Sequence, residues 1–230
     1  MRNPREIYAA YTIMPSLQMH QLRVAAVGKL ICEDFSSKGG SASGGKKPVN
    51  ERDIILACLF HDMGNILKFD LTKFPEFTAP EGVEYWESVK AECGEKYGTN
   101  QHVATEKIAR EIGLSESVIA YMKAVDFTKL DETLKEGIME TLICEYADMR
   151  VAPHGIVGME QRLRDGRERY LVHGTAKEWM ADSAERFETL VEAARGIEKI
   201  VLGDASIVPE DINDAAAAPL IEELWEYEVP

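Results

Sequence analysis

The sequence predicts an all-α fold, and three observations favour it. Apolar residues recur at helical spacing along most of the 230 residues, and no stretch of five or more alternates as a strand would. Hydrophobic residues make up 45% and charged residues 29%, as in soluble chains that build a core without disulfide or metal staples. No repeat of 20–50 residues is present. We therefore predict a compact helical bundle over residues 1–175 and a C-terminal helical extension over 176–230 packed on it.

The first helix is predicted over Leu17–Ile31, where apolar residues share one face and Ser16 precedes them as N-cap. His20 lies on the same apolar face, so its imidazole should point inward. Residues 36–50 are rich in glycine and serine and offer almost nothing to bury, which predicts a loop. Its role stays open.

The second helix is predicted to begin at Asn50 and to continue through residues 54–60, which are all apolar. A helix that is apolar on every side is typical of the centre of a protein. His61 and Asp62 follow directly, and Gly64 is expected to end the helix in a left-handed cap. Two ionisable side chains therefore close the most buried element.

The remaining chain is also expected to be helical, apart from the prolines and glycines of residues 70–98. That segment predicts an irregular connection with one short helix over 85–93. An apolar stripe from Trp179 to Ile200 predicts a long amphipathic helix that ends at Gly203, and this stripe could also pair two chains as a homodimer. Further helices are expected over 100–112, 115–125, 134–150 and 157–170, with a last turn or two over 220–227 after Pro219.

Charge and cysteine content exclude several classes of protein. The net charge of −14 opposes binding to a nucleic-acid duplex. The four cysteines are widely spaced without a C-x-x-C pair, which is typical of a reducing, cytoplasmic setting. The first residues lack the apolar core of an export signal, and no apolar run of about 18 residues is present, so we expect no membrane insertion.

Four side chains with metal-ligand chemistry are expected in or near the core. His20 lies on an apolar helix face, His61 and Asp62 end the central helix, and Asp148 closes a later one. Buried imidazoles and carboxylates are destabilising unless they are hydrogen-bonded or bind a cation. A mixed nitrogen and oxygen set suits manganese, iron, zinc, cobalt or nickel better than calcium, and magnesium also stays a candidate.

These residues stand in segments that resemble the HD-domain superfamily of metal-dependent phosphohydrolases. The segments are MHQLRVAAVGKLI, LACLFHDMGN and ICEYADMR, and the resemblance covers roughly residues 10–170. It implies an all-α core whose histidines and aspartates chelate one or two divalent metals. The matching positions are His20, His61, Asp62 and Asp148, and the activity implied is that of a phosphoric ester hydrolase.

The resemblance leaves open whether the site holds a second metal. His102 stands in NQHVATEKIAREIGL, which is similar to the segment where two-metal members place a further histidine. Those members have another histidine near the end of the following helix, where this chain has Val125 and Asp126. We therefore expect one metal first, and a second metal held by Asp62, His102 and Asp126 as the alternative.

A bound divalent ion would lower the pKa of its water toward about 7 and polarise a phosphoryl oxygen. Asp62 is expected to be catalytic, since its second oxygen can accept a proton from that water. Arg23, Lys68 and Arg150 are the nearest cations in sequence and are expected to contact an anionic substrate. The expected substrate is a small phosphorylated compound, with nucleotides among the candidates.

Two other functions stay open for this chain. A diiron oxygenase of the same superfamily is the first alternative, and His102 is the residue that supports it. A noncatalytic, metal-stabilised ligand-binding module is the second.

His154 and His173 lie in loop-like contexts and are expected at the surface. Residues 40–46 fit G-x-x-x-x-G-K, but no Ser or Thr follows and no strand precedes, so nucleotide binding there is not expected.

Overall fold

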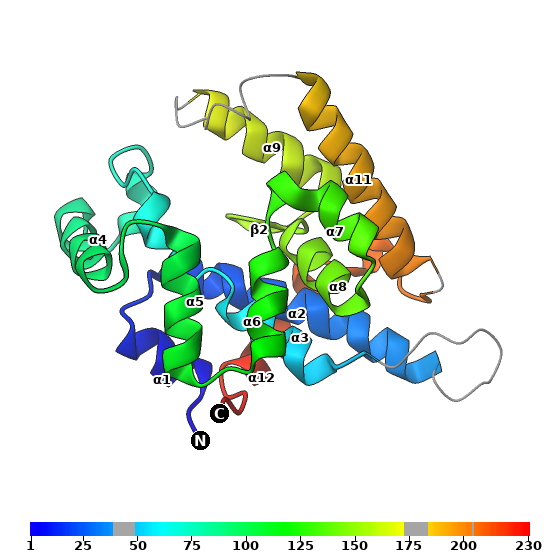
Figure 1. Ribbon diagram of the computed structural model, residues 1–230, viewed down its shortest axis with the longest axis horizontal. Helices are drawn as coiled ribbons and strands as arrows, with labels where there is room; N and C mark the ends of the chain where they lie inside the picture. The colour runs from blue at the N-terminus through cyan, green and yellow to red at the C-terminus, as the bar shows by residue number, and fades with distance from the viewer. Residues whose placement is uncertain (39–48, 173–183, 204) are drawn as a thin grey trace.

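The computed structural model describes residues 1–38, 49–172, 184–203 and 205–230, which form an all-α bundle (Figure 1). The only strands in these ranges are β1 (Val151–Ala152) and β2 (Gly155–Ile156), an antiparallel pair of two residues each. The helices are α1 (Pro4–Ala10), α2 (Pro15–Lys38), α3 (Glu51–Phe60), α4 (Val83–Tyr97), α5 (Gln101–Ile112), α6 (Glu116–Ala124), α7 (Leu130–Glu136), α8 (Met139–Asp148), α9 (Met159–Val172), α11 (Ala184–Leu202) and α12 (Asp214–Leu224). Short 3-10 helices are η1 (Asn65–Lys68), η2 (Pro75–Thr78), η3 (Phe127–Lys129) and η4 (Pro209–Asp211).

Helix α3 is the centre of the bundle, as the sequence predicts. The Asn50 side chain caps it by accepting a hydrogen bond from the Asp53 N–H, and residues 54–60 are all buried. Helices α2, α6 and α8 pack around α3, and α2 also packs against α8 (Figure 1). The C-terminal end of α3 therefore lies where several helices meet.

The N-terminal region contains more helix than the sequence analysis predicts. Helix α1 was not predicted, although Asn3 and Glu6 form a reciprocal capping box around Pro4, which is a recognisable start signal. Helix α2 continues to Lys38, so the first three residues of the predicted 36–50 loop are helical. Residues 39–48, including the misleading G-x-x-x-x-G-K stretch, lie outside the described residues.

The single helix predicted over 134–150 is wrong, because the chain forms α7 and α8 with a break between them. Gly137 adopts a left-handed conformation, with φ of 65°, and ends α7. Helix α8 then begins at Met139, and its buried residues 141–147 face the core. The break shortens α8 but leaves Asp148 as its last residue.

The predicted left-handed cap at Gly64 is also wrong. Its φ is −95°, a value that any residue can adopt. The glycine is required for a different reason: a Cβ atom there would lie 2.4 Å from the carbonyl oxygen of Gln101 and 2.9 Å from the backbone nitrogen of Thr105. Gly64 therefore lets the turn after His61 and Asp62 pack directly against the start of α5.

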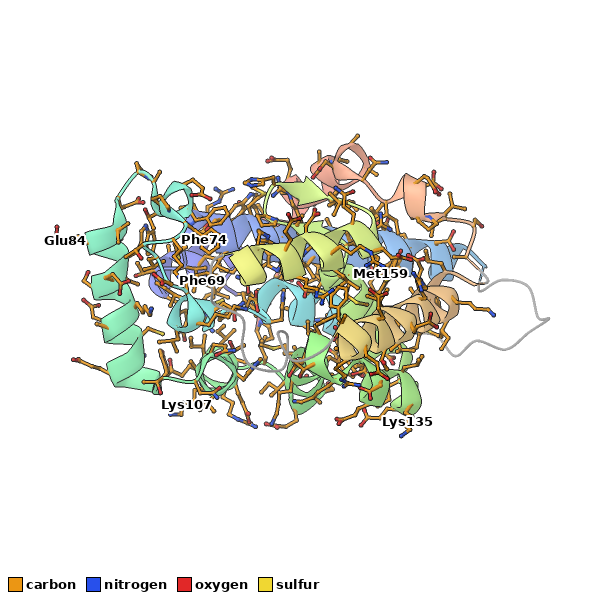
Figure 2. The ribbon with its side chains drawn as sticks, turned by 90° about the horizontal axis from the view of Figure 1, so that it is seen from above. Phe69, Phe74, Glu84, Lys107, Lys135 and Met159 are labelled. Carbon is orange, nitrogen blue, oxygen red and sulfur yellow. The ribbon has the colours of Figure 1, made fainter. Side chains whose placement is uncertain are left out.

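The segment over 70–98 contains η2 and α4, where only a short helix over 85–93 was predicted. Gly82 and Gly98 flank α4 with φ of 88° and 93°. Most of α4 faces solvent, and Figure 2 shows it at one end of the molecule with Glu84 directed outward. Helices α5, α6 and α9 match their predicted ranges within a few residues.

The C-terminal part wraps back onto the N-terminal helices. Helix α12 begins at Asp214 with Asn213 as its cap, so Pro219 lies inside this helix. The prediction that the last helix follows Pro219 is therefore wrong. Helix α12 packs on α2, and Val229 pairs with Arg2, which brings the two chain ends together (Figure 1). The proposed boundary at 175/176 and the start of the Trp179 stripe lie outside the described residues.

Two further properties bear on the sequence analysis. All four cysteines carry free thiols. None of the helices in the described ranges combines the length and apolar character needed to cross a membrane.

Candidate metal centre

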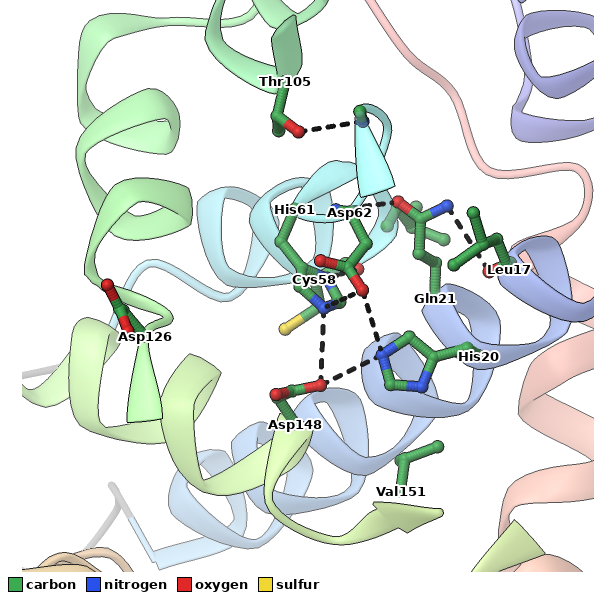
Figure 3. Close-up of polar contacts among 12 residues, drawn as sticks. Leu17, His20, Gln21, Cys58, His61, Asp62, Thr105, Asp126, Asp148 and Val151 are labelled. Atoms are coloured by element: carbon green, nitrogen blue, oxygen red, sulfur yellow. Dashed lines mark hydrogen bonds and ion pairs between the residues drawn. The ribbon is translucent and has the colours of Figure 1, made fainter. Parts of the chain in front are cut away.

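Three helices bring four potential metal ligands to one point. His20 comes from the second turn of α2, His61 and Asp62 come from the end of α3, and Asp148 is the last residue of α8. Figure 3 shows the two imidazoles and the two carboxylates directed toward a common centre. The sequence analysis selected these same four residues, although they are spread over nearly 130 positions of the chain.

The distances between these side chains fit a shared cation. The Nε2 atom of His20 lies 3.6 Å from Asp62 Oδ2 and 3.0 Å from Asp148 Oδ1. The Nε2 atom of His61 lies 3.7 Å and 3.4 Å from the same two oxygens. Ligand atoms about 2.1 Å from one ion lie about 3.0 Å apart at right angles and about 3.4 Å apart at tetrahedral angles. The four observed distances of 3.0–3.7 Å lie close to both values, and ligand atoms of His20, His61 and Asp62 all lie within 4.8 Å of one another.

The orientation of His61 separates a ligand from an ordinary ion-pair partner. Its Nδ1 atom contacts the carbonyl oxygen of Cys58 at 2.9 Å, so Nδ1 carries a hydrogen and Nε2 is the free ligand atom. Nε2 is buried, has no hydrogen-bond partner among the described residues, and lies between the two carboxylates at distances beyond a normal N–H···O bond. A buried nitrogen aimed between two carboxylates fits a metal better than a hydrogen bond.

The carboxylates give the site a strong preference for positive charge. Burial alone would lower the pKa of His61, but the neighbouring carboxylates of Asp62 and Asp148 outweigh it and raise this pKa to about 10. Burial also opposes ionisation of Asp148, yet the close contact with His20 at 3.0 Å and the positive charge of His20 and His61 hold the pKa of this carboxyl well below its usual range. Without a metal, a proton on His61 supplies part of the missing positive charge.

This proton predicts a pH dependence. The ordinary pKa of histidine is about 6.5, so between pH 6.5 and about 10 the folded protein keeps a proton that the unfolded chain has released. The stabilisation is complete below about pH 6.5 and disappears as pH rises toward 10. We expect the Tm of the metal-free protein to fall across this interval, and the Tm increase on adding Mn²⁺ to grow, because metal binding requires the unprotonated imidazole.

Thermal unfolding in chelator and in Mn²⁺, from pH 6.5 to 8.5, measures both trends. A His61→Gln variant is the control, since it removes the titrating imidazole and should flatten both curves. A Tm of the metal-free wild type that rises over this range would contradict the assignment of the proton to His61.

Two of the three predicted substrate contacts face other parts of the protein. Arg150 is only 2% exposed, and its guanidinium donates to the carbonyl oxygens of Val157, Pro209 and Ile212 and to the Tyr146 hydroxyl. Arg150 thus fixes the chain just after Asp148, and its guanidinium is held by the core and does not face a substrate, contrary to the prediction. Arg23 reaches toward Asp214 of α12, with Nε 3.4 Å from Oδ1.

The other predicted residues lie apart from the four ligands. Lys68 is exposed at the end of η1, with Nζ 5.8 Å from the ring centroid of Phe69. His102 is exposed at the start of α5 and contacts the Gln101 amide. The backbone N–H and the hydroxyl of Thr128 both donate to Asp126 Oδ1, and the Asp126 carboxylate points away from the centre in Figure 3. Within the described residues, neither His102 nor Asp126 joins a metal-binding group with Asp62.

Three buried polar residues around the centre were not predicted from the sequence. Gln21 accepts a hydrogen bond from the Asp62 N–H at 3.2 Å, and Thr105 accepts one from the Gly64 N–H at 2.9 Å. Glu145 is buried one turn before Asp148, and burial together with the Asp148 charge raises its pKa well above the ordinary value. Gln21 and Glu145 each lie within an otherwise buried helix segment, which is the signal that could have identified them.

Comparison with known proteins gives one match. A family model described as HD domain matches residues 18–138, slightly more than half of the chain. The match includes His20, His61 and Asp62 and ends ten residues before Asp148. No curated protein and no solved structure matches the chain.

Proposed function

The chain belongs to the HD domain family, and from this membership and the geometry of the centre we propose that it is a metal-dependent phosphohydrolase acting on small phosphate esters. The family consists mostly of hydrolases. The observation that carries the proposal is the buried, unpartnered Nε2 of His61 between two carboxylates. Such a site binds a divalent metal, which makes hydroxide available at neutral pH and polarises a phosphoryl oxygen.

The side chains around the centre have distinct tasks in this proposal. His20, His61 and Asp148 would hold the ion, and Asp62 would hold it through Oδ2, the oxygen that faces both imidazoles. The other carboxylate oxygen of Asp62 can then accept the proton of the attacking water, because this side chain is 20% exposed and reaches the solvent side. Lys68, as the predicted cation that remains exposed, is the candidate contact for a substrate phosphate.

The accessibility of the ligands favours a small substrate. The side chains of His20, Asp62 and Asp148 are 15%, 20% and 26% exposed, so solvent has only limited access to the centre. Such limited exposure is more compatible with a small terminal phosphate monoester than with a folded polymer. The net charge of −14 also disfavours a polyanion. Nucleoside monophosphates and sugar phosphates are the first compounds to test.

Phosphate release from such a panel, with Mn²⁺, Co²⁺, Zn²⁺ or Mg²⁺ added to chelator-treated protein, tests the proposal. We expect hydrolysis of at least one monoester that stops when chelator is added and returns with metal. Protein that binds no metal, or that binds metal and hydrolyses none of the panel, would contradict the proposed activity. Oxygen consumption by iron-loaded protein would instead support the oxygenase alternative.

A substitution at Asp62 separates its catalytic task from folding. Asp62→Asn keeps the shape of the side chain but removes the charge and the proton acceptor, so we expect turnover to fall at least about 100-fold. Asp70→Asn is the matched control, since Asp70 is a partly exposed aspartate that bonds only to Thr72 and Lys73. Turnover of the Asp62→Asn protein within threefold of the control would contradict a catalytic role for this carboxylate.

A further inference from the structure

We infer that Gln21 is a positioning residue of the metal centre: its side chain fixes the backbone of Asp62 against α2 and thereby sets the affinity for the metal. The inference rests on the proposed function, because it concerns the same centre. It adds a residue that neither the family match nor the four-ligand pattern assigns.

Gln21 connects two of the three ligand-bearing segments through one side chain. It directly follows His20 on α2 and is fully buried. Its Oε1 atom accepts the Asp62 N–H at 3.2 Å, and its Nε2 atom donates to the Leu17 carbonyl oxygen at 3.4 Å (Figure 3). A backbone donor and a backbone acceptor fix which end of the amide faces which partner. Through Gln21, the backbone of Asp62 is tied to the helix turn that carries His20.

The hydrogen bonds at the end of α3 show why the Asp62 N–H needs the Gln21 oxygen as its acceptor. In a continuing helix, the Asp62 N–H would bond to the carbonyl oxygen of Cys58, four residues earlier. That carbonyl instead receives the hydrogen of His61 Nδ1 at 2.9 Å, and α3 ends at Phe60. Gln21 Oε1 supplies the acceptor for the Asp62 N–H, so this buried donor is satisfied while the Cys58 carbonyl orients His61.

Thr105 supports the same turn from the opposite side, but at a position that matters less for the ligands. It accepts the N–H of Gly64, two residues past Asp62, and comes from α5, which contributes none of the four ligands. Gln21 acts on a ligand residue directly and from a ligand-bearing helix. Removing its oxygen should therefore loosen the position of Asp62 relative to His20 more than it disturbs the rest of the fold.

Titration of the full-length, chelator-treated protein with Co²⁺, followed by its visible absorption, tests the inference without relying on activity. Gln21→Met keeps the length of the side chain and removes the acceptor, and we expect it to weaken Co²⁺ binding about 10- to 100-fold and to alter the absorption bands. Gln18→Met is the matched control. Gln18 is on the same helix and its amide donates only to the carbonyl of Ile13, so its affinity should stay within about threefold of wild type.

A third variant separates the acceptor from packing. Gln21→Glu keeps an oxygen facing the Asp62 N–H, and its fully buried carboxyl should be protonated, so that its O–H can still donate to the Leu17 carbonyl oxygen. We therefore expect its affinity to stay within about threefold of wild type. Affinity of Gln21→Met within threefold of wild type, or an equal loss in Gln21→Met and Gln21→Glu, would overturn the inference. If Gln21→Met does not fold, Gln21→Glu decides alone, and a tenfold loss there is the contradicting result. A wild type that binds no Co²⁺ would contradict the proposed function itself.

Discussion

Replacing His61 by alanine is expected to abolish stoichiometric metal binding and to lower phosphatase turnover at least about 1,000-fold, which corresponds to about 4 kcal/mol of transition-state stabilisation. The loss is large because His61 has the least exposed side chain of the four, at 3%, and its Nε2 atom lies between both carboxylates. Without it, Asp62 and Asp148 face each other with only His20 to balance them. The helices should persist, since residues 54–60 of α3 remain in the core.

Metal content per chain, turnover and far-ultraviolet circular dichroism of the same samples measure this outcome. His154→Ala is the control, because His154 is an exposed histidine outside the four ligands and should retain both metal and activity. A His61→Ala protein that keeps one metal per chain and wild-type turnover would show that the centre is not where the geometry places it.

Replacing Gly64 by alanine is expected to give the largest loss of stability, about 3 kcal/mol. The added Cβ would lie 2.4 Å from the Gln101 carbonyl oxygen and 2.9 Å from the Thr105 nitrogen, and backbone atoms cannot move aside as a flexible side chain can. For a chain of this length, such a change lowers the Tm by about 6–12 °C. The shifted turn should also weaken metal binding, since His61 and Asp62 directly precede it.

Gly94→Ala is the matched control for that experiment. Gly94 lies within α4, where an added Cβ would meet only the Leu67 side chain at 3.7 Å, an ordinary contact. Alanine there should leave the stability unchanged or raise it by up to about 1 kcal/mol, because alanine favours helix. Equal Tm values for the two variants, measured by thermal unfolding, would contradict the requirement for close packing of the turn on α5.

The four residues of the centre could be selected as candidates because helical periodicity decides which side chains face the core. His20 interrupts an apolar face, and His61 and Asp62 end a helix that is apolar on every side, so each needed a partner. Periodicity does not decide which helix faces meet, however. The resemblance to the HD-domain superfamily supplied that information, and it also identified Asp148, whose own segment is less distinctive.

The partners of the supporting residues could not be predicted, because they lie far away in the sequence. Gln21 serves an N–H that is 41 residues distant, and Arg150 binds carbonyls up to 62 residues away. Arg150 was predicted to contact substrate because it is close to Asp148 in sequence. Its donors instead bind groups in the core. Gly137 differs, since its left-handed conformation is a local property, and only the apolar pattern running past it concealed the break.

The most direct test of the central claim is a crystal structure of metal-loaded protein with anomalous scattering recorded at the edge of the added metal. The account predicts one anomalous peak per chain, within about 2.0–2.3 Å of Nε2 of His20 and His61 and of one oxygen each of Asp62 and Asp148. A peak at other residues, or crystals soaked in metal that show no peak among these four side chains, would contradict it.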